Sequence, residues 1–64
     1  METVNTQYLR EALQQASGNG FGRPDDALTK MFEVYSDWMG NAVLTVAERQ
    51  AGAGIYNDAI QGVR

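Results

Sequence analysis

Apolar residues recur every three or four positions in two stretches of the chain, which are separated by a glycine-rich segment. The first stretch, residues 3–17, consists mainly of strong helix formers. Four apolar side chains in it share one face of a helix: Leu9, Ala12, Leu13 and Ala16. The pattern therefore predicts a short helix over about 4–17, with Thr3 or Asn5 as its N-cap.

A turn is expected over residues 18–25. Gly18, Gly20 and Gly22 interrupt the helical pattern, and Pro24 fixes φ and disfavours a helical residue before it. Asp25 is a good N-cap residue for a second helix that starts at about residue 26.

The second stretch contains no proline, and its apolar residues keep helical spacing to the end of the chain. Steps of three and four link a heptad-like seam, in which Arg49 is the one polar member. Its apolar members are Phe32, Tyr35, Met39, Ala42, Val46, Ala53, Tyr56, Ile60 and Val63. This spacing predicts one long helix over about 26–62.

Two short motifs leave local alternatives. Four small residues, 51–54, indicate either a kink or break in the long helix or the close approach of a neighbouring helix. Trp38-Met39-Gly40 matches a W-x-G turn signature of small secreted helical hairpins. Because it falls inside the helical period, we expect Trp38 to be a core or interface aromatic.

These elements predict an all-α fold: a helical hairpin of a short N-terminal and a long C-terminal helix in one small domain, 1–64. The short helix covers only part of the long one, so we expect oligomeric packing to cover the rest. The expected assembly interface comprises Leu28, Phe32, Tyr35, Trp38, Met39, Val46, Gly52, Gly54, Tyr56, Ile60 and Val63.

Composition narrows the chemistry. Without His or Cys the chain has no disulfide, thiolate, imidazole metal ligand or His-based triad, and no acidic spacing resembles a calcium loop. We expect no catalytic residues, no cofactor and no metal, and so no enzyme. The net charge of −3, with five scattered basic residues, argues against nucleic acid as a partner.

No apolar stretch approaches the roughly 20 residues of a transmembrane helix, so no transmembrane segment is expected. The first residues lack the basic start and apolar run of a secretory signal. We therefore expect a protein made in the cytoplasm without a cleaved signal.

One resemblance is carried by the segment from residue 24 to residue 64. Its residues resemble the pattern of needle subunits of bacterial type III secretion systems. The likeness is carried by Pro24-Asp25-Asp26-Ala27-Leu28, by an aromatic residue about ten positions on, and by Asn41 and Ile60. The C-terminal residues are also similar to inner-rod and flagellar rod-base proteins. The residues that carry this second likeness are Arg49, Tyr56, Asp58 and Ile60.

The resemblance implies a structural subunit that self-assembles through its long helix into a tubular protein-export appendage, with other export-apparatus proteins as further partners. It also implies export to the cell envelope or surface. Needle and rod stay open as alternatives. A different class stays open as well: a small helical adaptor or inhibitor that docks its apolar helix face on a specific protein partner.

Overall fold

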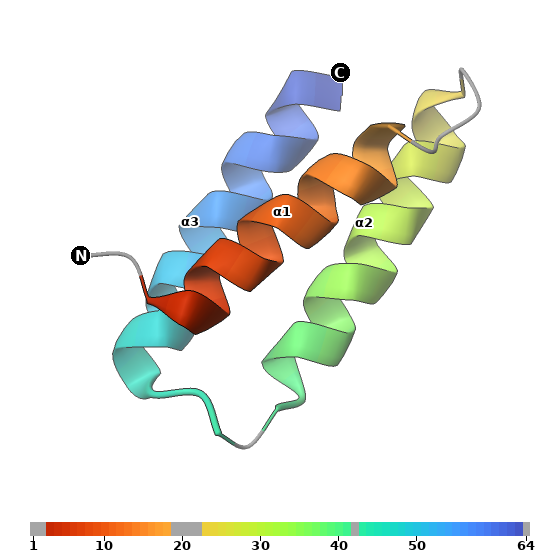
Figure 1. The fold of residues 1–64 in the computed structure, drawn as a ribbon. Helices are drawn as coiled ribbons and strands as arrows, with labels where there is room; N and C mark the ends of the chain where they lie inside the picture. Colours follow the sequence, from red (N-terminus) through yellow and green to blue (C-terminus); the bar gives the residue numbers. More distant parts are fainter. Residues whose placement is uncertain (1–2, 19–22, 42, 64) are drawn as a thin grey trace.

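The computed structural model describes residues 3–18, 23–41 and 43–63, and in these ranges the fold is all-helical, as predicted (Figure 1). Three helices follow one another: α1 (Val4–Gly18), α2 (Pro24–Met39) and α3 (Val46–Val63). Residues 19–22 of the expected turn and Ala42 of the expected seam lie outside the described residues.

Helix α1 begins with a reciprocal hydrogen-bonded cap. The Thr6 N–H donates to Thr3 Oγ1 at 3.3 Å, and the Thr3 N–H donates to Thr6 Oγ1 at 2.8 Å. Two of the backbone donors near the helix start are thereby satisfied. Of the two expected caps, Thr3 is the one that forms.

Helix α2 begins two residues earlier than a cap at Asp25 requires, so that prediction is wrong. Arg23 is the N-cap, with extended backbone (φ −108°, ψ 116°), and Pro24 takes the first helical position. Proline suits this position because its φ is preset and its missing N–H would have no partner there. Asp25 and Asp26 lie in the first turn, where the positive end of the helix dipole favours carboxylates.

The predicted single helix over about 26–62 is instead two helices, α2 and α3, with a turn between them. The Asn41 side chain holds this turn, because its Oδ1 accepts the Val43 N–H at 2.9 Å. Thr45 then caps α3, since its Oγ1 accepts the Glu48 N–H at 3.1 Å. The Thr45 N–H in turn donates to Glu48 Oε1 at 2.9 Å, which completes a capping box.

The glycines of residues 51–54 do not interrupt α3, which is continuous through them. Of the two alternatives for this segment, the structure has the close approach of a neighbouring helix. Gly52 is buried, whereas Gly54 is exposed.

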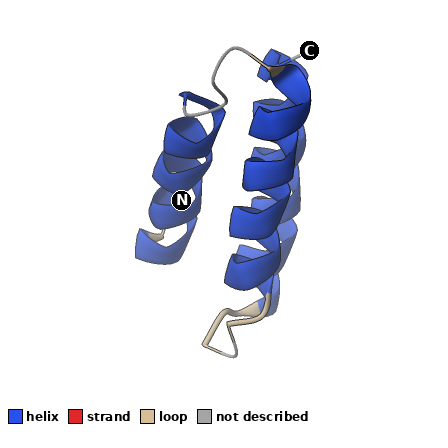
Figure 2. Ribbon diagram, turned by 90° about the vertical axis from the view of Figure 1, so that its right-hand side faces the viewer, coloured by secondary structure: helices blue, strands red, loops and turns tan. Residues whose placement is uncertain are grey.

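Successive helices run in opposite directions, and α1 lies over the joint between α2 and α3 (Figure 1). Figure 2 shows α1 as one layer, with α2 and α3 overlapping as the other. The predicted hairpin is therefore a three-helix arrangement, in which every helix packs against the other two. The fully buried side chains Leu9, Leu13 and Met31 come from α1 and α2.

Candidate interaction surface

Trp38 occupies the junction of all three helices, not an outer surface. Its side chain is 6% exposed, and its indole Nε1–H donates to the Asn5 backbone oxygen of α1 at 2.9 Å. A Cβ placed on Gly52 would lie 2.2 Å from Cζ3 and 2.5 Å from Cη2 of the indole, and 3.2 Å from Leu9 Cδ2. Gly52 is therefore what lets the ring lie against the backbone of α3. Two residues of the expected assembly interface, Trp38 and Gly52, thus belong to the core.

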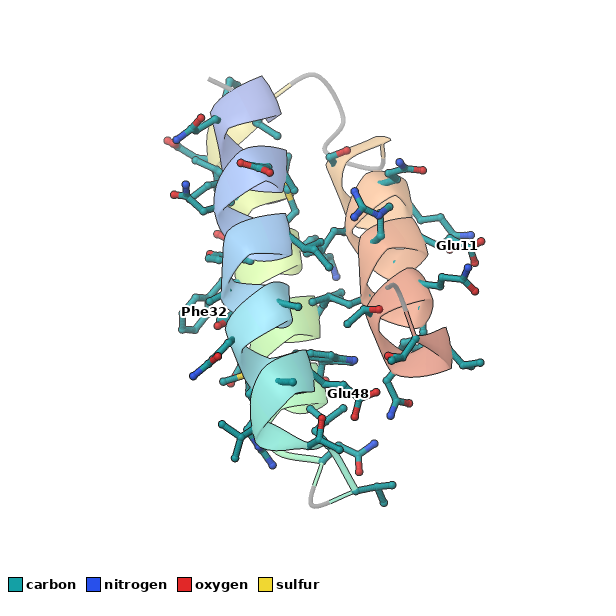
Figure 3. All side chains as sticks on the ribbon, turned by 90° about the vertical axis from the view of Figure 1, so that its left-hand side faces the viewer. Glu11, Phe32 and Glu48 are labelled. Carbon is teal, nitrogen blue, oxygen red and sulfur yellow. The ribbon has the colours of Figure 1, made fainter. Side chains whose placement is uncertain are left out.

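Glu48 joins the start of α3 to the start of α1, and sequence reasoning missed it. Its Oε2 accepts Thr3 Oγ1–H at 2.6 Å and Asn5 Nδ2–H at 3.0 Å, while Oε1 is bound within the capping box. The residue is only 8% exposed and lies between α3 and α1 (Figure 3). The spacing Thr45-x-x-Glu48 is the signal that could have identified it.

The environment of Glu48 favours its charged form. The hydrogen bond from Thr3 lowers the pKa of the carboxyl below its ordinary value of 4.5, followed by the bond from the Thr45 backbone N–H. Desolvation opposes them by raising the pKa, and the hydrogen bonds outweigh it. The hydrogen bonds of this carboxylate hold the start of α3 against the start of α1.

Arg49, the polar member of the predicted seam, closes the C-terminal end of α2. Its Nη2 donates to the Asn41 backbone oxygen at 2.8 Å, and its Nη1 donates to that of Met39. A cation at this end suits the negative end of the helix dipole. The guanidinium therefore lies beside the turn that separates α2 from α3.

Much of the expected interface forms the joint between α2 and α3. Tyr35 and Tyr56 stack with ring centroids 4.3 Å apart and ring planes 9° from parallel. Both tyrosines are half-buried and pack against the core, as do Met39, Ile60 and Val63. Leu28 is also half-buried.

The remaining expected interface residues are exposed. Phe32 is 59% exposed and Val46 72%, and a Cβ on Gly54 would meet nothing within 4 Å. Figure 3 shows Phe32 on the side of α2 that is turned away from α1. Helical spacing places other members of the seam beside these two exposed side chains. We call the surface that this spacing predicts around Phe32 and Val46 the outer face; besides these two residues it comprises Leu28, Ser36, Met39, Arg49, Ala53 and Ile60.

The outer face carries few charges: on α3, Arg49 shares it by its spacing from Val46 and Ala53, and most charged residues of α2 lie on the opposite flank. Between α1 and α2 lie two shallow hollows of about 450 and 560 Å³, which share Ala12, Val34 and Asp37 in their walls. Lys30 and Glu33 line the larger one. Charged side chains of α2 thus gather on the groove side, and only Asp25, at the first turn, shares the outer side with Phe32 by its spacing of seven.

No group of three or more His, Cys, Asp or Glu side chains that could hold a metal ion occurs in residues 3–18, 23–41 and 43–63. Of the helices in these ranges, none is both long and apolar enough to cross a membrane. Comparison of the chain with protein-family models, with curated proteins and with solved structures found no match.

Proposed function

We propose that this protein works by binding protein, and that the outer face is its contact surface. The observation that carries the proposal is the exposure of two large apolar side chains of the seam, Phe32 on α2 and Val46 at the start of α3, each more than half exposed. Large apolar side chains that gather on one surface are typical of interaction sites, whereas single exposed ones are ordinary.

The composition of the outer face supports this function. It combines an aromatic ring, a methionine and branched aliphatic side chains, which are residue types that form the centres of protein interfaces. The stacked pair Tyr35 and Tyr56 joins α2 to α3. A preformed surface of this kind loses little conformational entropy on binding.

Two forms of this function remain as proposals: assembly into a tubular export appendage, and docking of one face of a compact domain on a protein partner. Assembly into a tubular export appendage, which the resemblance implies, was expected to use residues 26–62 as one helix. The turn at residues 40–45 folds that segment back on itself, and Tyr35 and Tyr56 become partners within one chain. Docking of one face of a compact domain on a partner agrees better with this geometry than assembly into a tube.

Cross-linking from the outer face tests the proposal. Benzoylphenylalanine placed at Phe32 is expected to capture a discrete protein product in cells that make the chain, since the ring lies inside the contact. The same photoreactive residue at Glu11, which points away from α2 and α3 on the far side of α1, is the matched control (Figure 3). Equal and diffuse capture from both positions would refute a contact at the outer face.

A further inference from the structure

We propose that the smaller of the two hollows between α1 and α2 binds the guanidinium group of an arginine side chain on another polypeptide. The site lies on the groove side of α2, so it does not depend on a contact at the outer face. Its wall offers three features that suit this group: a carboxylate without a partner, an aromatic ring that is mostly exposed, and an amide oxygen that is left to accept.

The wall of the smaller hollow, which has a volume of about 450 Å³, carries a single charge among the described residues, that of Asp37. The other described residues of the wall are neutral: Asn5, Tyr8, Ala12, Val34, Trp38 and Asn41. No hydrogen bond or ion pair joins the Asp37 side chain to another described residue. A hollow with one unpaired carboxylate attracts a cation and repels an anion.

The aromatic residues of the wall favour guanidinium over the ammonium group of a lysine. Tyr8 is 65% exposed, so most of its ring remains available to a planar group. A guanidinium group stacks on aromatic rings and is more weakly hydrated than an ammonium group. It can therefore cover the Tyr8 ring with its face while its edge donates two N–H groups to Asp37.

Asn5 supplies a further acceptor. Its Nδ2 donates to Glu48 Oε2 at 3.0 Å, which leaves Oδ1 as the atom that can accept. The Tyr8 hydroxyl can accept as well. A guanidinium group has five N–H donors and no acceptor, so each of these oxygens can pair with it.

The larger hollow indicates that the arginine belongs to a polypeptide. The two hollows share Ala12, Val34 and Asp37 in their walls, so they form one groove between α1 and α2. Lys30 and Glu33 line only the larger hollow, where the positive charge of Lys30 disfavours a second cation. We place the guanidinium group in the smaller hollow and the residues that flank the arginine along the larger one.

NMR titration of the isotope-labelled chain with the peptide acetyl-Ala-Arg-Ala-amide tests the site at constant ionic strength. The indole N–H signal reports binding directly, because Trp38 is the one tryptophan of the chain and borders the hollow. A ligand of this size should bind with a Kd on the order of 1 mM. The same peptide with citrulline, a neutral group of almost the same shape, should bind about tenfold or more weakly.

Asp37→Asn is expected to weaken binding of the arginine peptide about tenfold, because it removes the charge and nearly preserves the shape. The variant should retain the wild-type helix signal, since Asp37 is exposed. Glu33→Gln removes the same charge from the same helix but lies outside the smaller hollow, so it is the matched control. Equal weakening by both variants would reduce the effect to general attraction by an acidic flank and would overturn the site.

Three ligands decide the identity of the group and its source. Tighter binding of acetyl-Ala-Lys-Ala-amide than of the arginine peptide would overturn guanidinium as the group. Ethylguanidine should bind severalfold more weakly than the arginine peptide, and equal affinities would overturn a polypeptide as the source. Equal shifts with the citrulline peptide, or no saturable shift of the Trp38 signal, would overturn the site itself. Photo-cross-linking from position 32 tests the outer face separately, so either proposal can fail alone.

Discussion

The two sides of the α2–α3 pair differ in how many of their side chains find partners within one chain. On the inner side, the Trp38 ring lies against Gly52, its N–H is bound, and Glu48 has hydrogen-bond donors on both carboxylate oxygens. No buried side-chain nitrogen or oxygen in the described part of the chain lacks a partner. On the outer side, Phe32 and Val46 have most of their surface in water.

This difference separates residues that fix the fold from residues that remain available for binding. A close fit with satisfied polar groups penalises almost any substitution. An exposed apolar surface tolerates change in the isolated chain, and its residues matter once a partner covers them. Substitutions on the two sides of α2 and α3 should therefore have opposite signatures.

The largest loss of stability is expected for Trp38→Ala. Truncation of a buried aromatic costs about 3–5 kcal/mol, and this one also leaves the Asn5 carbonyl without its donor. A chain of this length has a total stability of roughly 3–10 kcal/mol, so the variant should be largely unfolded at 25 °C. Thermal melts followed by circular dichroism measure this. Val46→Ala on the outer side should melt close to wild type, and equal losses in both variants would contradict the contrast.

The sequence could not distinguish the buried Trp38 from the exposed Phe32 because both residues lie on the same helix. Both are aromatic members of the apolar face of α2, and spacing alone assigns both to an interface. Which ring is buried depends on where α1 docks and on the space left by Gly52, and these are tertiary contacts. The all-α class and α1 depend on local spacing and propensity, and they were predictable.

The turn at residues 40–45 was missed for another reason. Met39 and Val46 are seven residues apart, so the heptad phase of the seam continues across the break without a gap. Gly40-Asn41 and the Thr45-x-x-Glu48 capping box were the signals against a continuous helix. Local capping chemistry, rather than periodicity, decides where these helices end.

The next largest effect is expected for Gly52→Ala, with Gly54→Ala as its matched control in the same helix. At Gly54 the added methyl meets nothing, so higher helix propensity should stabilise the chain by about 1 kcal/mol. At Gly52 the same gain is opposed by overpacking against the Trp38 ring, which costs about 1–3 kcal/mol. We expect a net loss at Gly52 and a gain at Gly54 in urea unfolding. Stabilisation by both would show that the ring moves aside easily.

The pH dependence of stability in Glu48→Gln tests how much the inner side depends on this carboxylate. The pKa of Glu48 is lower in the folded chain than its ordinary value of 4.5, so the unfolded chain binds the proton more readily. The stability that this carboxylate contributes is present above about pH 4.5 and is lost as the pH falls through its folded pKa. The amide variant should be less stable at pH 7 and lose less stability between pH 7 and pH 3. Glu11→Gln, on the exposed side of α1, is the control for the removal of one carboxylate charge. An unchanged profile in Glu48→Gln would show that the Glu48 carboxylate does not stabilise the contact between the starts of α1 and α3.

The smallest effect on the isolated chain is expected for Phe32→Ser, although this substitution removes the largest exposed side chain of the outer face. The ring is 59% exposed, so only about two fifths of the residue's area leaves water on folding, and the change in unfolding free energy should be about 1 kcal/mol, well below that of Trp38→Ala. Urea unfolding at low micromolar concentration measures the monomer, and the same experiment at a hundredfold higher concentration includes association. If the outer face is covered by a partner copy, the wild-type midpoint rises with concentration while that of Phe32→Ser does not, because only the folded wild type gains binding energy. A large loss at low concentration would instead make Phe32 a core residue, and the contrast between the two sides would fail.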